Sequence, residues 1–111
     1  VELLIQNGAD INAVDDNGRS SLIKAAFSGN AEVVSLLLAQ GAEINTLDHS
    51  KRTALHWAVL RSRPKAIKVL LDAGADYSLK SEDGWTAMML ALKEGDVEVI
   101  QVLDDAGVRM K

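Results

Sequence analysis

Residues 53–75 read TALHWAVLRSRPKAIKVLLDAGA, and the pattern of this stretch predicts the fold of the whole chain. Leu55 and Val59 are four residues apart, a spacing that places two apolar side chains on one face of a helix. Pro64 then opens a second apolar block, which runs up to Gly74. Proline suits the first position of a helix, and glycine suits the residue just past its end. The stretch therefore predicts two short helices joined by a tight loop.

The same stretch recurs along the chain with a period of 33 residues. A glycine-led segment follows each second helix, with the sequences GADIN at 8–12, GAEIN at 41–45, GADYS at 74–78 and GVRMK at 107–111. A hydroxyl residue precedes each first helix, at Ser20, Thr53 and Thr86. The apolar block of the second helix has the same period, at 33–38, 66–71 and 99–103. Self-similarity at one fixed period indicates a repeat protein whose units stack on their neighbours.

This period divides the chain into one partial unit and three further units. Their boundaries are 1–14, 15–47, 48–80 and 81–111. Each hydroxyl residue is a good N-cap, because its oxygen can accept from an unpaired backbone N–H of the first turn. Asn30 and Asp96 suit the same role at a second helix, and Gly29 and Gly95 suit a left-handed end to the first helix. Turn sequences such as DNG at 16–18 predict tight hairpins between units.

These residues resemble the ankyrin repeat. The segment Thr53-Ala54-Leu55-His56 is close to the Thr-Pro-Leu-His signature of that family, and the segment 8–12 matches its loop. The resemblance extends over essentially the whole chain. It implies an all-α solenoid of stacked helix–turn–helix units, with β-hairpin loops that project from the helices as fingers.

The chain departs from the family pattern at several positions. The family builds a polar bridge from the histidine of its signature, and His56 can supply it here. Ile23 and Met89 stand at the matching positions of the other units, so the bridge is expected in the middle unit alone. Ser62 replaces the glycine between the two helices, and a side chain in the left-handed conformation costs roughly 1 kcal/mol.

The two ends of the chain are expected to differ. Asp104 stands where the earlier units have Leu38 and Leu71, and a polar outer face is what a terminal repeat needs. The unit 81–111 is therefore interpreted as a C-terminal capping repeat. Residues 1–4 supply a second helix without its first, which would leave apolar surface bare, so further sequence upstream is expected.

Composition limits the classes of protein to which the chain can belong. Hydrophobic residues make up 48% and charged residues 25% of the chain, which is the balance of a folded protein and not of a disordered one. The absence of cysteine excludes disulfides and thiolate zinc sites, and it favours an intracellular, cytoplasmic location with the nucleus as an alternative. No apolar run approaches the roughly 18 residues of a membrane span, so no membrane partner is expected.

No catalytic constellation is present in the sequence. His56 would need a nucleophile or an orienting carboxylate to act as a general base, and only the capping Thr53 is near it. We interpret His56 as structural, and His49 as a surface contact residue rather than a metal ligand. The acidic turns at 15–18 and 82–84 lack the ligand spacing of a calcium loop, and no phosphate-binding glycine motif occurs. We predict no catalytic, metal or cofactor site and no enzymatic activity.

Positive charge is concentrated in the middle unit. Residues 48–80 hold seven basic and three acidic residues, a net +4, whereas the whole chain carries −4. An ordinary solvated surface would explain this distribution. The sharper interpretation is a basic stripe for an acidic protein segment, because guanidinium groups pair well with carboxylates. Nucleic acid is not expected as a partner, since an acidic domain repels phosphates along most of its length.

The large apolar residues have alternative interpretations. Trp57 lies in the first helix of its unit, where the family packs an apolar side chain against the neighbouring repeat, so we expect it in the core. Trp85 occupies a finger position that arginine holds in the other units, and it serves either as a binding anchor or in local packing. Phe27 and Leu60 occur late in the first helix, either in the binding surface or in contact between repeats.

In a stacked solenoid, the fingers and first helices of successive units align into a continuous groove. We expect this concave groove to bind a protein segment or domain that presents acidic residues, above all to Arg52 and Arg61. The predicted lining residues are Asp16, Asn17, Arg19, Phe27, Ser28, His49, Ser50, Arg52, Leu60, Arg61, Asp83, Trp85, Lys93 and Glu94. An alternative function is that of a regulatory or targeting region in a larger enzyme or effector. The chain is expected to be monomeric, with weak self-association through the bare N-terminal edge as a further alternative.

Overall fold

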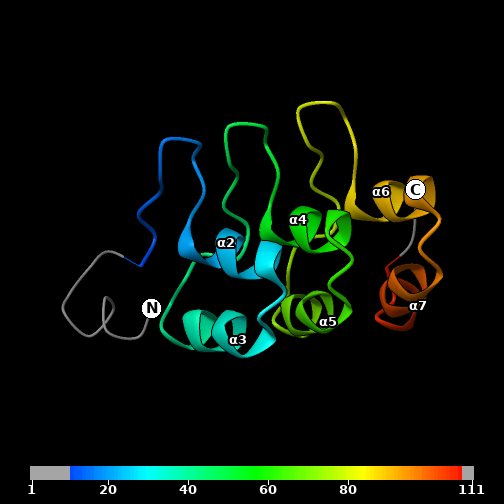
Figure 1. The fold of residues 1–111 in the computed structure, drawn as a ribbon, viewed down its shortest axis with the longest axis horizontal. Coiled ribbons are helices and arrows are strands. Elements are labelled where there is room, and N and C mark those ends of the chain that lie inside the picture. Colours follow the sequence, from blue (N-terminus) through cyan, green and yellow to red (C-terminus); the bar gives the residue numbers. More distant parts are fainter. Residues whose placement is uncertain (1–10, 109–111) are drawn as a thin grey trace.

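The computed structural model describes residues 11–108, which form six helices in three pairs. The first helices of the pairs are α2 (Ser21–Ser28), α4 (Ala54–Leu60) and α6 (Ala87–Glu94), and the second helices are α3 (Ala31–Ala39), α5 (Pro64–Asp72) and α7 (Val97–Asp105). The first helices form one layer and the second helices another, and each pair packs on the next (Figure 1). The predicted all-α solenoid is confirmed. Most of the predicted partial unit, including the apolar edge at 1–4, lies outside the described residues.

Each first helix begins directly after the hydroxyl residue that the sequence predicts as its N-cap. The side-chain oxygens of Ser20, Thr53 and Thr86 each accept from the backbone N–H three residues further on, at 3.2 to 3.3 Å. Asn30 and Asp96 do the same for α3 and α7, at 3.1 and 3.3 Å. The middle second helix, α5, begins instead with a proline and has no side-chain cap. These contacts fix where the helices start, because each satisfies a backbone donor that the helix itself leaves unpaired.

The loop between the two helices of a unit has a left-handed residue in all three pairs. This residue is Gly29 in the first pair, with φ 77°, and Gly95 in the last, with φ 69°. In the middle pair it is Ser62, with φ 55°, as the departure from the family pattern predicts. The Ser62 hydroxyl donates to the carboxylate of Asp96 in the following unit. The strained loop is thus tied to the next repeat.

The fingers close with the same backbone hydrogen bonds. In the first finger the N–H of Asp15 donates to the carbonyl of Arg19 at 3.0 Å, and the N–H of Gly18 donates to the carbonyl of Asp15 at 2.9 Å. Equivalent bonds close the fingers at 48–52 and 81–85. The fingers project from the layer of first helices as a row (Figure 1).

The fingers are hairpin turns without strands. Val14 and Ser20 form one isolated antiparallel bridge, and the residues that the structure describes contain no β-strand. A backbone bond of 3.0 Å from His49 to Asn17 links the first two fingers, and a matching bond of 2.8 Å links the second and third. The predicted hairpin loops are therefore present, each closed by too few backbone bonds to form strands, and neighbouring fingers touch at their tips.

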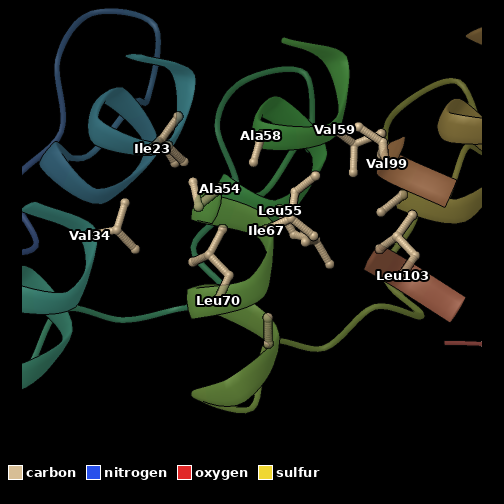
Figure 2. Packing of buried hydrophobic residues seen from close by; sticks show 14 of the residues in the cluster. Ile23, Val34, Ala54, Leu55, Ala58, Val59, Ile67, Leu70, Val99 and Leu103 are labelled. Atoms are coloured by element: carbon tan, nitrogen blue, oxygen red, sulfur yellow. The ribbon is translucent and has the colours of Figure 1, made fainter. Parts of the chain in front are cut away.

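The core runs without interruption through the three units. Ala25, Ala58 and Ala91, at matching positions on the first helices, are at most 8% exposed, and their small size lets neighbouring units approach closely. Larger side chains from α4 and α5, such as Leu55 and Ile67, fill the space between the layers and reach toward α7 (Figure 2). Stability is therefore shared between repeats, as expected when each unit packs only on its neighbours.

His56 joins the middle unit to the one that follows it. Its Nδ1 accepts from the backbone N–H of Thr53 at 3.1 Å, so Nδ1 carries no proton. The proton is on Nε2, which donates to the carbonyl of Trp85 at 2.8 Å. Burial lowers the pKa of His56 below its ordinary value, so the ring is neutral at pH 7. Ile23 and Met89 occupy the matching positions of the other units, so the described chain makes this bridge once. The contacts of His56 agree with its interpretation as a structural residue.

Candidate protein-binding surface

The finger face is the surface formed by the fingers (15–19, 48–52 and 81–85) and the adjoining sides of α2, α4 and α6 (Figure 1). All of the predicted lining residues keep solvent-accessible surface. The half-buried ones are Arg19, Phe27, Ser50, Arg52, Leu60 and Trp85. The exposed ones are Asp16, Asn17, Ser28, His49, Arg61, Asp83, Lys93 and Glu94. Six of these fourteen residues belong to three groups, each centred on an aromatic ring.

The first group surrounds the indole ring of Trp57 on α4. The guanidinium carbon of Arg19 lies 4.8 Å from the ring centroid, and that of Arg52 lies 5.0 Å from it. The two arginines come from successive fingers, and a tryptophan ring attracts such cations by about 0.5–2 kcal/mol, depending on their exposure. The Nε atoms of both arginines are buried and have no hydrogen-bond partner among the described residues. One aromatic ring thus contacts two cationic groups from successive fingers.

Asp48 orients this group from a buried position. Its Oδ1 accepts from the backbone N–H groups of Ser50 and Arg52, both at 2.9 Å. Its Oδ2 accepts from Nε1 of Trp57 at 2.8 Å and lies 3.8 Å from Nε of Arg19. One buried carboxylate therefore fixes the ring and lies near the guanidinium group of Arg19 alone, which leaves an excess of positive charge at the surface.

The second group extends the first toward α2. The ring centroid of Phe27 lies 5.4 Å from that of Trp57, and the two planes are tilted by 56°. The guanidinium carbon of Arg61 lies 4.8 Å from the Phe27 ring centroid. Within residues 11–108, neither Arg52 nor Arg61 forms an ion pair. The surface here combines two half-buried aromatic rings with the Arg61 guanidinium group, which forms no ion pair among the described residues.

The third group lies in the last repeat. Nζ of Lys93 lies 5.1 Å from the ring centroid of Trp85. The same tryptophan is only half-buried, and its carbonyl accepts the bond from His56. Trp85 therefore packs locally and still presents part of its ring to solvent.

The 33-residue spacing and the geometry of the helix pairs agree with two family models. A model described as ankyrin repeats (3 copies) matches residues 1–81, and one described as ankyrin repeats (many copies) matches residues 61–103. The chain belongs to the ankyrin repeat family. Ankyrin repeats are in general protein–protein interaction modules, and they are typically non-catalytic. A search of curated proteins found no match to this chain.

Sequence reasoning missed two residues of the ankyrin finger face. Trp57 was expected in the core, and it does pack against the core but is only half-buried. The 33-residue period aligns Trp57 with the exposed Lys24 and with the buried Leu90, so the alignment does not indicate a surface position. Asp48 entered the sequence analysis only as one of the acidic residues in the net charge of the middle unit. It aligns with Asp15, which makes the corresponding turn contacts in the first finger.

Other acidic side chains of the ankyrin units have turn or capping roles. Hydrogen bonds lower the carboxyl pKa of three aspartates. Asp15 accepts from the backbone N–H of Arg19, Asp76 from the hydroxyl of Ser78, and Asp96 from the hydroxyl of Ser62. Across the described range 11–108, no cluster of three or more His, Asp or Glu side chains is placed to hold a metal ion. None of the helices α2 to α7 has the length and apolar character needed to cross a membrane.

Proposed function

We propose that this ankyrin domain binds a protein segment rich in aspartate or glutamate through its finger face. Arg19, Arg52 and Arg61 are the residues that pair with the carboxylates of the partner. The observation that carries the proposal is the pair of guanidinium groups held against Trp57, of which only that of Arg19 lies near a carboxylate of the described chain, that of the buried Asp48.

Pre-organisation makes these arginines suitable for recognition. Arg19 and Arg52 lie against the ring of Trp57, so they lose less side-chain freedom on binding than arginines extended into water. A guanidinium group can donate two parallel hydrogen bonds to one carboxylate, which gives direction as well as charge. Trp and Arg are also the residue types that contribute most to the affinity of protein interfaces.

The charge of the neighbouring repeat gives the bound segment an expected direction. Asp83 and Glu94 are exposed in the last repeat, beyond the basic middle. The acidic part of the partner then lies over Arg52 and Arg61, and a neutral or basic part lies toward the last repeat. The net charge of −4 disfavours a nucleic-acid backbone, which carries negative charge along its whole length.

The test starts from random peptides displayed on phage and selected on the whole chain. We expect the selected peptides to be enriched in aspartate and glutamate. The double variant Arg52→Glu, Arg61→Glu should bind them at least about tenfold more weakly, which corresponds to about 1.4 kcal/mol. The affinity of the wild-type chain should fall as salt concentration rises, because these charges lie at the surface.

The control is Lys65→Glu, Lys68→Glu, which makes the same change of charge on exposed positions of α5, in the other helix layer. These lysines should leave the affinity nearly unchanged. Selected peptides without acidic enrichment would contradict the proposal. Equal weakening by the two double variants would also contradict it, because net charge alone would then explain the binding.

A further inference from the structure

The two aromatic rings at the centre of the finger face, those of Trp57 and Phe27, contact more positive than negative charge. Three guanidinium groups lie against the two rings, those of Arg19, Arg52 and Arg61. Among the described residues, the acidic side chain bonded to these rings is that of Asp48, which accepts from the indole N–H at 2.8 Å. Three positive charges and one negative charge therefore surround the ring pair, which is a positive excess of two.

The wider surroundings do not remove this excess. Lys24 and Asp15 of the first repeat form an ion pair at 3.4 Å, so together they add no net charge. At the first two finger turns, the exposed Asp16 and Lys51 have opposite charges. Arg63 adds one more cation, and its Nε donates to a backbone carbonyl of α2 at 3.2 Å. A partner group with more than one negative charge would therefore match this surface best.

The burial of Arg19 and Arg52 limits how a partner can reach them. The Nε atoms of both are buried, whereas the two side chains as a whole are only half-buried. An incoming anion therefore meets the terminal Nη groups. A carboxylate brings two oxygens and one negative charge to these donors. A phosphoryl group on a side chain brings three acceptor oxygens and about 1.5–2 negative charges at pH 7, which matches the excess more closely.

We propose that the acidic segment bound by the finger face contains a phosphorylated serine or threonine, which pairs with Arg52 and Arg61. This inference rests on the proposed function and adds the chemistry of the partner's central residue. Arginine clusters are a common means of recognising phosphorylated segments. A nucleic acid differs, because its phosphates recur along the strand and would also meet the exposed Asp83 and Glu94. Binding would then be switched on by a kinase that modifies the partner.

The test uses three pools of synthetic peptides that share random flanking residues and differ at one central position. That position holds phosphoserine, aspartate or serine. Each pool is passed over the whole immobilised chain, and we expect retention to fall in that order. Sequences recovered from the phosphoserine pool are then made with each of the three central residues, and their affinities are measured by fluorescence anisotropy. The phosphoserine form should bind at least about tenfold more tightly than the aspartate form, because it adds charge-assisted hydrogen bonds.

Two variants that each remove one positive charge separate local from overall charge. Arg61→Gln should reduce the advantage of phosphoserine over aspartate to about threefold or less. Lys65→Gln, at an exposed position of α5, should leave that advantage unchanged. An equal reduction by the two variants would overturn the inference. Displacement of the phosphopeptide by inorganic phosphate at the same concentration would also overturn it, because the anion alone would then be the ligand.

The same measurements distinguish this inference from the proposed function. Equal affinity for the phosphoserine and aspartate forms, with both weakened by Arg52→Glu, Arg61→Glu, would overturn the inference alone. Affinities that this double variant leaves unchanged would contradict the inference and the proposed function together.

Discussion

The middle repeat, residues 48–80, and the repeats on either side of it share one fold but differ where the backbone turns. At the finger turn the flanking repeats have Gly18 and Gly84, whereas the middle repeat has Lys51 with φ 60°. At the loop between helices the flanking repeats again have glycine, and the middle repeat has Ser62 with φ 55°. The middle repeat therefore adopts the same conformations with residues that do not favour them.

This difference shows how stacking can hold strain that a repeat would not keep by itself. A side chain in the left-handed region costs about 1–2 kcal/mol, and it persists where the surroundings determine the backbone. The middle repeat packs on a repeat at each side and is tied to the next one through His56 and Ser62. It also supplies Trp57 and Asp48 to the finger face. The most constrained repeat thus carries the centre of the candidate binding surface.

The largest expected effect concerns equivalent core positions in the middle repeat and in the last repeat. Ile67→Ala should lower the free energy of unfolding by about 2–5 kcal/mol, because Ile67 is 0% exposed and its removal leaves a cavity between repeats. Ile100→Ala, at the matching position of the half-covered last repeat, should lower it by about half as much. Urea unfolding of both variants measures this difference. Equal losses would mean that the last repeat is packed as completely as the middle one.

The next effect concerns the histidine bridge, which only the middle repeat makes. His56→Leu should lower the free energy of unfolding by about 1–3 kcal/mol, because the carbonyl of Trp85 loses its donor. Thr86→Ala, which removes the neighbouring cap alone, should cost about 1 kcal/mol. A smaller loss for His56→Leu than for Thr86→Ala would indicate that the bridge contributes little to the stacking of the two repeats.

The same bridge gives a pH dependence with a definite sign. Burial lowers the folded-state pKa of His56 below the unfolded value of about 6.5. The unfolded chain therefore binds a proton first, and stability is fully present above about pH 6.5 and falls as the pH is lowered through the folded pKa. The lowered carboxyl pKa values of Asp15, Asp76 and Asp96 remove stability only below about pH 4.

Thermal unfolding from pH 7 to pH 5 measures this dependence. The wild-type chain should lose stability across the range, and the His56→Gln variant should show a flatter profile. The same slope in both would mean that other groups set the pH dependence in this window.

The smallest expected effects on stability concern residues whose backbone is in the left-handed conformation. Lys51→Gly should raise the free energy of unfolding by about 1 kcal/mol, because glycine adopts the left-handed conformation without strain. Ser62→Gly should raise it by less, because the variant also loses the hydrogen bond from the Ser62 hydroxyl to Asp96. Gly18→Ala should lower it by about 1–2 kcal/mol, since φ there is 77° and an added Cβ would meet the His49 ring at 2.6 Å. Chemical unfolding of the three variants gives the signs. A loss of stability for Lys51→Gly would contradict the comparison between the repeats.

Most of the fold could be predicted because it depends on local rules that recur every 33 residues. The caps at Ser20, Thr53 and Thr86 and the left-handed Ser62 follow from residue type and position. The left-handed Lys51 could also have been found, since the period aligns it with Gly18. The absence of strands in the described fingers could not be predicted, because it depends on how many backbone bonds the two arms of each finger make with each other.

The candidate surface was harder to predict, because it depends on contacts between repeats. The sequence placed Arg52 and Phe27 near the surface, but it gave no sign that Trp57 would lie among them. That arrangement requires Asp48 to hold the indole N–H at 2.8 Å and Arg19 to reach over from the preceding finger. Neither contact follows a fixed local spacing.

The most direct test of the central claim is an NMR titration of the ¹⁵N-labelled chain with an acidic peptide selected on it. The Trp57 Nε1–H, which donates to Asp48 beside the two arginines, reports on the centre of the finger face. We expect this resonance and the side-chain Nε–H signals of Arg19 and Arg52 to shift most, while backbone amides of α5 shift little. Saturable shifts centred on α5, with the Trp57 indole signal unmoved, would contradict it.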